Sequence, residues 1–235
     1  MIINILLCDI FEGLLPDYIP SYEWMFKKLI DEAAPGNEYK TWRTFEGELP
    51  TRLNTYELYI ITGCNDSVYD DKQWIKELLD WIRTAEKAKT KIVGICFGHQ
   101  AVAYALGGRV ERSKKGWGAG IRLQNVVDER YRGFFKDGQL SLLCNHHDQV
   151  VRLPQAATRI ATSEFCENES FEVGDNIITF QGHPEYMVDY EKHLIDNFAA
   201  DEPESVKQKA LQSFETNEHR GLEVAKFIMN YWTKK

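Results

Sequence analysis

The chain has 235 residues, of which 43% are hydrophobic and 27% charged, and a formal net charge of −8. This length allows one large α/β domain with a sizeable core, and the composition is ordinary for a soluble globular protein. The negative charge argues against a nucleic-acid partner, since neutralising phosphates takes clustered lysine and arginine. No apolar run approaches the ~20 residues of a membrane span, and the N-terminus lacks the basic region of a signal peptide. We therefore expect a cytoplasmic protein that binds neither nucleic acid nor membrane.

The first half of the chain alternates between strand and helix patterns. An apolar strand pattern over residues 2–8 is typical of a strand covered on both faces. The patterns that follow are a helix over 22–34, strands over 39–45 and 56–62, a helix over 70–86, a strand over 91–95 and a helix over 98–106. This alternation predicts an α/β fold with an open, mostly parallel twisted sheet flanked by helices, of the flavodoxin-like type. The segment 11–20 would then lie at the edge of the sheet where such folds bind ligands.

The second half changes character after Gly107-Gly108. Short strand-like runs cover residues 109–112, 119–127, 140–145, 159–162, 170–173 and 177–180. They predict an added antiparallel or mixed sheet that packs onto the parallel sheet or extends it. From residue 187 the pattern is helical, in two or three amphipathic segments broken near Pro203 and around 217–221. We expect a single domain over 1–235, with a core of about 2–190 and a C-terminal helical extension of about 187–235.

The five cysteines are odd in number and widely spaced. They form no CxxC pair, and without an export signal they predict reduced thiols rather than disulfides or a zinc site. The one glycine-rich element, 94–98, lacks the lysine of a phosphate-binding loop. We therefore expect no metal ion and no organic cofactor.

Cys96 stands where a strand pattern runs directly into a helix pattern. Gly94 and Gly98 flank it two residues before and two residues after, which is the small-residue spacing of a nucleophile elbow. The thiol would lie at the N-terminus of a helix, where free N–H groups and the helix dipole favour a thiolate. The N–H of Phe97 would face the oxyanion formed when a thiolate adds to a carbonyl. The alternative is a buried, inert cysteine, and the short motif alone does not exclude it.

A thiolate nucleophile needs a base, and His183 is the strongest of the six histidines. It ends the apolar run 177–180 and would stand at a strand terminus on the ligand edge. Glu185 returns to the same face two residues later and could bond the imidazole nitrogen turned away from Cys96. The alternative is a capping histidine followed by a solvated glutamate.

The other histidines have weaker claims to the role of base. His99 would pack beneath the turn that carries Cys96. His193 and His219 would be solvated residues of the polar C-terminal helices. His146 and His147 belong to a polar segment after a strand, where a substrate contact and a hydrogen-bonded turn are equally good interpretations.

With Cys96, His183 and Glu185 in place, the chain resembles the class I, or triad-type, glutamine amidotransferases. The motifs that carry the resemblance are ITGCNDSVYDD at 61–71, GICFGHQ at 94–100, CNHHDQVVRLP at 144–154 and FQGHPEY at 180–186. Their order and spacing match over roughly residues 2–190. The chain is most similar to stand-alone proteins related to the amidotransferase domain of GMP synthetase, including plant γ-glutamyl peptidases.

The resemblance implies that Cys96 attacks a γ-glutamyl amide carbonyl and forms a γ-glutamyl thioester, which water hydrolyses. His183 would act as base and then as acid to the leaving amine, and Glu185 would orient it. Gly63 and Phe97 match the positions whose backbone N–H groups form the oxyanion hole.

The resemblance also implies a binding site for the glutamyl group. Gln100 matches the residue that holds this group, and its α-amino and carboxylate groups would be bound by Asn145, His146, His147 and Asp148. The family often has glycine at the position of His147 and small residues at those of Cys64 and Asn65. These three residues would border the substrate pocket. Their difference from the family therefore affects the identity of the leaving group more than the reaction mechanism.

Three functions fit this pattern. The first is a glutaminase that supplies ammonia to a synthetase subunit in trans, since nothing after Gly182 resembles an acceptor domain. The second is a self-contained γ-glutamyl peptidase or hydrolase, in which the 11–20 loop and His147 shape the leaving-group pocket. The third is a non-catalytic binding protein that kept the fold, against which the intact Cys96, His183 and Glu185 argue.

Overall fold

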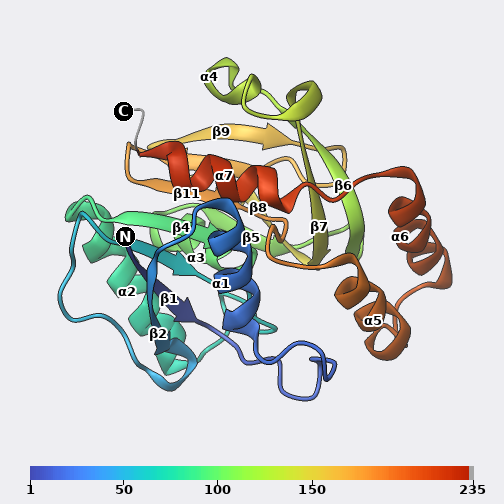
Figure 1. Ribbon diagram of the computed structural model, residues 1–235, viewed down its shortest axis with the longest axis horizontal. Helices are drawn as coiled ribbons and strands as arrows, with labels where there is room; N and C mark the ends of the chain where they lie inside the picture. The colour runs from blue at the N-terminus through green and yellow to red at the C-terminus, as the bar shows by residue number, and fades with distance from the viewer. Residues whose placement is uncertain (233–235) are drawn as a thin grey trace.

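A nine-stranded mixed sheet forms the centre of the molecule in the computed structural model, which describes residues 1–232 (Figure 1). In spatial order its strands are β2 (Glu38–Arg43), β1 (Ile2–Leu7), β3 (Leu58–Ile61), β4 (Lys91–Ile95), β11 (Ile177–Phe180), β10 (Ser170–Val173), β9 (Ala157–Thr162), β6 (Gly118–Val126) and β7 (Gln139–His146). The first five run parallel to their neighbours, and the remaining four join antiparallel. The added strands therefore extend the parallel sheet rather than pack onto it.

Two short strands lie outside this sheet and pair with each other. They are β5 (Arg109–Arg112) and β8 (Asp148–Arg152), which form an antiparallel ladder. Because β8 follows β7 almost directly, this ladder places the polar segment 144–149 at the junction of the two sheets.

Helices cover both faces of the large sheet. They are α1 (Tyr22–Ala33), α2 (Gln73–Lys87), α3 (Phe97–Ala105), α4 (Glu129–Arg132), α5 (Val188–Phe198), α6 (Glu204–Thr216) and α7 (Gly221–Tyr231), with 3-10 turns at Thr44–Glu46 and Lys136–Gly138. Helices α1 and α7 pack together on one face, and α2 and α3 pack together on the other (Figure 1). The three C-terminal helices confirm the predicted breaks near Pro203 and around 217–221. Within the described residues, no helix is both long and apolar enough to cross a lipid bilayer.

The two faces of the sheet bury two separate hydrophobic cores. Side chains alternate along a strand, so Ile3 and Ile5 of β1 pack under α1 and α7, whereas Leu6 packs under α2 and α3. This double burial explains why β1 is apolar at almost every position. A smaller cluster joins α5 and α6 to the start of β6 through Trp117 and Ala210.

The sheet order decides where the candidate site lies. Strand β4 has β3 on one side and β11 on the other, and all three are parallel. Their carboxyl ends therefore meet at one edge, which brings Gly63 after β3, Cys96 after β4 and His183 after β11 together. The predicted α/β fold class is confirmed.

Candidate active site

Cys96 sits on a strained turn between β4 and α3. Its φ of 50° and ψ of −102° lie in a region that non-glycine residues rarely adopt. A Cβ atom at Gly94 would come within 2.6 Å of the Gly98 carbonyl oxygen, and one at Gly98 within 2.2 Å of the Ile61 carbonyl oxygen. Glycine is therefore required at both flanking positions, and the turn has the geometry of a nucleophile elbow.

His183 and Glu185 lie beside the thiol, and all three side chains are buried. The Nδ1–H group of His183 donates to Glu185 Oε1 at 2.7 Å, and the imidazole also lies within hydrogen-bonding reach of Cys96. The Tyr186 ring stacks on the imidazole with centroids 3.9 Å apart and 15° between the planes. The imidazole is therefore held on one edge by a carboxylate and on one face by an aromatic ring.

The surroundings of His183 favour its protonated form. Burial opposes the charge, but the negative charge of Glu185 and the neighbouring Cys96 outweigh it and raise the pKa of His183 to about 10. The imidazole is thus able to hold the proton that a cysteine nucleophile gives up and to pass it to a leaving group.

The two predicted oxyanion donors, the N–H groups of Phe97 and Gly63, differ in their hydrogen bonding. Phe97 is the first residue of α3, so its N–H has no carbonyl partner within the helix. The Gly63 N–H instead donates to the hydroxyl of Tyr22 at 3.1 Å, and that hydroxyl donates to Glu185 Oε1 at 2.9 Å. An oxyanion at this position would compete with Tyr22 for the Gly63 N–H.

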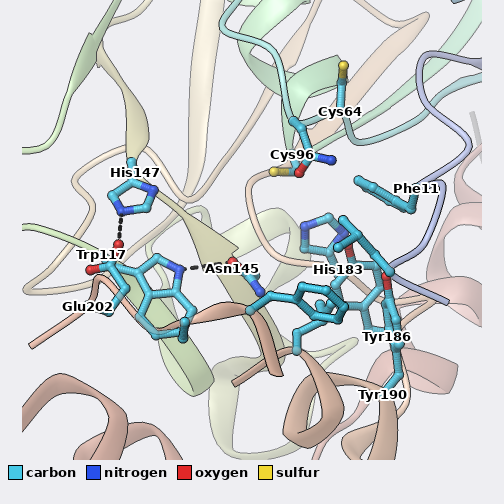
Figure 2. Close-up of a pocket in the computed structure, with 15 residues that line it drawn as sticks. Phe11, Cys64, Cys96, Trp117, Asn145, His147, His183, Tyr186, Tyr190 and Glu202 are labelled. Carbon is cyan, nitrogen blue, oxygen red and sulfur yellow. Dashed lines mark hydrogen bonds and ion pairs between the residues drawn. The ribbon is translucent and has the colours of Figure 1, made fainter. Parts of the chain in front are cut away.

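Two cavities meet at Cys96. The first, of about 230 Å³, is lined by polar groups that include Gln100, Arg112, Asn145, His146 and Asp148; we call it the polar cavity. The second, of about 180 Å³, is lined by the aromatic and aliphatic side chains of Phe11, Leu14, Trp117, Tyr186, Tyr190 and Leu194; we call it the aromatic cavity (Figure 2). Cys64, Asn65, Asn145 and His147 line both cavities.

The residues predicted to bind the glutamyl group all line the polar cavity. Gln100 donates to the Asp148 carbonyl at 3.0 Å and to Gln181 at 3.1 Å. The Asp148 carboxylate accepts hydrogen bonds from Ser67 and Tyr69. His146 donates from Nδ1 to the Asp148 carbonyl at 2.9 Å, so its buried Nε2 is an acceptor, and this atom has no hydrogen-bond partner among residues 1–232.

His147 and Asn145 form the boundary between the cavities. His147 Nε2 pairs with Glu202 Oε1 at 2.7 Å, and the imidazole stacks on Trp117 (Figure 2). The Trp117 indole N–H donates to Asn145 Oδ1 at 2.9 Å. These contacts tie the segment between α5 and α6 to the predicted substrate pocket.

The structure confirms the predicted position of His99 and corrects that of His219. His99 is buried beneath the elbow with Nδ1 2.9 Å from the Thr179 hydroxyl, and burial lowers its pKa to about 3. The prediction that His219 is a solvated helix residue is wrong. Its Nδ1 accepts from the Leu143 N–H at 3.2 Å and its Nε2 donates to the Pro184 carbonyl at 3.3 Å. His219 precedes α7 rather than lying within a helix, and it braces the strand end that carries His183.

A second group with the same residue types lies on the added strands. The ligand atoms of Cys144, His146 and Glu169 lie within 4.8 Å of one another, close enough to hold a metal ion. The Arg122 guanidinium is 3.9 Å from Glu169 and would repel a cation there. Cys144 lies within β7, burial raises the pKa of its thiol, and it has no elbow geometry. Of the two cysteines, Cys96 is the better nucleophile candidate.

Some residues of the site were not predicted. Tyr186 stacks on the His183 imidazole, and Gln181 Nε2 lies 3.6 Å from the Cys96 sulfur. Both residues belong to the motif at 180–186, so their closeness to His183 in the chain could have identified them. Tyr22 and Glu202 lie outside the four motifs. The sequence indicated only that Tyr22 begins a helix and that Glu202 belongs to the polar C-terminal segment, so neither was identified as a site residue.

Comparison with known proteins identifies the family. The family described as "Glutamine amidotransferase class-I" matches residues 14–201, and the chain belongs to this family. It is 34% identical over 186 residues to "Gamma-glutamyl peptidase 4" of Arabidopsis thaliana, covering 76% of this chain and 73% of that protein. It is 33% identical over 169 residues to "Gamma-glutamyl peptidase 3" of the same plant, covering 68% of each. The predicted family is therefore confirmed.

Solved structures agree with this assignment. A glutamine amidotransferase from Thermotoga maritima aligns with a TM-score of 0.73 and 26% identity, covering 99% of this chain and 96% of that one. A glutamine amidotransferase from Methylobacillus flagellatus aligns with a TM-score of 0.69 and 20% identity, covering 99% and 93%, which shows a shared fold.

Proposed function

We propose that this protein hydrolyses a γ-glutamyl amide through a γ-glutamyl thioester on Cys96. The Cys96 sulfur attacks the amide carbonyl, and the N–H groups of Gly63 and Phe97 stabilise the oxyanion. His183, oriented by Glu185, gives its proton to the departing nitrogen. It then takes a proton from the water that cleaves the thioester, and glutamate leaves.

One observation carries this proposal. The strained elbow at Cys96 adjoins a buried imidazole that is bonded to a carboxylate at 2.7 Å, and a cavity opens at the sulfur. The polar cavity supports the substrate class, because a γ-glutamyl group carries an α-ammonium and an α-carboxylate. Arg112 and Asp148 offer charges opposite to both, and Gln100 and Asn145 offer amides.

The relatives named γ-glutamyl peptidases favour cleavage of a γ-glutamyl bond to an amine other than ammonia. Transfer of ammonia to a synthetase subunit in trans is the alternative that the family name allows, and it stays a prediction.

The test is glutamate release from glutamine and γ-glutamyl p-nitroanilide by the purified protein, with Cys96→Ala as the blank. We expect turnover of at least one substrate and a γ-glutamyl adduct on the Cys96 peptide after acid quenching. The Cys96→Ala variant should lose at least about a thousandfold in kcat/KM, as for removal of a covalent nucleophile. A variant within tenfold of the parent would contradict the covalent mechanism.

A further inference from the structure

The position of His183 indicates which cavity receives the leaving group. Among the described residues, His183 lines the aromatic cavity, whereas the side chains lining the polar cavity do not include it. The proton from His183 goes to the departing nitrogen, so that nitrogen must lie within hydrogen-bonding distance of the imidazole. The leaving group therefore extends from Cys96 into the aromatic cavity, and the γ-glutamyl group occupies the polar cavity on the other side.

The aromatic cavity is far larger than ammonia requires. A water molecule, which is similar in size to ammonia, needs roughly 10–15 Å³ of cavity volume on the same measure. The aromatic cavity has about 180 Å³. With glutamine as the substrate the leaving group is ammonia, which would fill only a small part of this cavity.

The lining of this cavity selects against a negatively charged leaving group. Phe11 and Leu14 come from the loop after β1, Trp117 from the segment before β6, and Leu194 and Phe198 from α5. Among the described lining residues there is no lysine or arginine.

The two imidazoles in the wall already have carboxylate partners. His147 is paired with Glu202 and His183 with Glu185, each at 2.7 Å. Asn65 and Asn145 offer only neutral amides in this wall. A carboxylate on the leaving group would therefore lose its hydration and meet no unpaired cation among the described lining residues.

We propose that the aromatic cavity is a leaving-group subsite for an apolar primary amine without a carboxylate, aromatic or branched aliphatic. This inference rests on the proposed function and specifies its substrate class. The C–N bond of the γ-glutamyl amide breaks as the S–C bond to Cys96 forms, and the nitrogen takes the His183 proton. Water then replaces sulfur on the acyl carbon, His183 regains a proton, and the products are glutamate and the free amine.

Three substrates distinguish the effect of the leaving group's size from the effect of its charge. L-Glutamine has an ammonia leaving group, γ-glutamylphenethylamide has an apolar aromatic one, and γ-glutamylphenylalanine has the same ring and chain with an added carboxylate. We expect kcat/KM for the phenethylamide to exceed that for each of the other two at least tenfold, measured by glutamate release with Cys96→Ala as the blank.

Variants of the cavity wall locate the effect. Leu14→Ala and Phe198→Ala each remove an apolar side chain of the aromatic cavity, on two separate elements, and neither side chain has a polar group to lose. Each should lower the ratio of kcat/KM for the phenethylamide to that for glutamine at least fivefold. Leu123→Ala, an exposed leucine of β6 outside both cavities, is the matched control and should leave both values at those of the parent.

The outcomes are distinguishable. Glutamine turned over as fast as the phenethylamide would overturn the apolar subsite and leave the proposed function intact. Equal turnover of γ-glutamylphenylalanine would overturn the exclusion of a carboxylate and indicate a peptide substrate. An unchanged substrate ratio in both wall variants, with melting temperatures near that of the parent, would place the leaving group elsewhere. No glutamate from any of the three would overturn the proposed function, and this inference with it.

Discussion

The hydroxyl group of Tyr22 connects two parts of the proposed catalytic machinery. It accepts the Gly63 N–H and donates to Glu185 Oε1, the same oxygen that the His183 Nδ1–H group bonds. Burial and the nearby Glu185 raise the pKa of Tyr22 well above its usual value, so the phenol keeps its proton and stays a donor. The ring packs against Phe11, with centroids 4.4 Å apart, which fixes the hydroxyl in place. We infer that Tyr22 positions the general base His183 through its hydrogen bond to Glu185.

Tyr22→Phe should therefore lower kcat about tenfold and change KM much less. Loss of the hydroxyl removes a hydrogen bond to the buried Glu185 carboxylate, which orients His183. Leaving a buried group without its partner costs about 1–3 kcal/mol. Glutamate release over a range of substrate concentrations separates the two constants.

Tyr131→Phe provides the matched control for Tyr22→Phe. Tyr131 also donates to a buried carboxylate, Glu172 at 2.6 Å, but it lies in α4, away from Cys96. It should lose a similar free energy of unfolding and keep the parent's kcat. If both variants lose only stability, Tyr22 has no positioning role.

At the scale of elements, the turn from β4 into α3 depends on close contact between backbones. The Gly98 N–H donates to the Thr62 carbonyl at 3.2 Å, and the Cys96 N–H donates to the Phe180 carbonyl at 2.9 Å. The elbow is thus bonded to the ends of both neighbouring strands, which hold Cys96 in its positive-φ conformation. This contact is possible only while residues 94 and 98 have no side chain.

Gly98→Ala should destabilise the protein by about 3 kcal/mol, the upper end of the usual cost of overpacking, because its Cβ would lie 2.2 Å from a backbone oxygen that has little freedom to move. Activity should fall with it, since the elbow must shift to relieve the contact. Urea unfolding at equilibrium measures the change. Gly133→Ala is the control: its Cβ would meet nothing within 4 Å, and we expect a change below about 0.5 kcal/mol.

At the scale of the whole molecule, two histidines are buried in the neutral form. Burial lowers the pKa of His99 to about 3 and that of His146 well below its usual value. In the unfolded chain these imidazoles take up protons near pH 6.5, so the unfolded state binds more protons below that pH. Stability from this source is present above pH 6.5 and is lost as the pH falls toward 3.

His99→Asn should flatten this acid-side loss of stability. One histidine of this kind contributes a slope of up to about 1.4 kcal/mol per pH unit, or about 2 kcal/mol between pH 6.5 and 5. Urea unfolding of the parent and the variant at several pH values measures both slopes, and the data near neutral pH give the packing cost separately. Parallel curves for the two proteins would contradict the buried neutral state of His99.

The helices, the strands and the elbow could be predicted from the sequence, because they depend on residues close together in the chain. The alternation of strand and helix patterns predicted the α/β fold, and the glycines around Cys96 predicted a turn that the structure contains. His183 and Glu185 were identifiable because they are two residues apart at the end of an apolar run, so that one local pattern placed both. Chain position alone did not reveal the bracing role of His219, since its contacts with Leu143 and Pro184 cross between elements.

The surroundings of the Cys96 thiol could not be predicted from the sequence, because they consist of residues far apart in the chain. The Tyr22 hydroxyl lies 41 residues from Gly63 and 163 from Glu185 in the chain, and His147 lies 55 residues from Glu202. Whether the added strands extend the parallel sheet or pack onto it was also settled only by the fold, because strand pairing depends on partners that no local pattern specifies. The division into a polar and an aromatic cavity arises in the same way, from a loop after β1 and a helix after β11 that meet only in three dimensions.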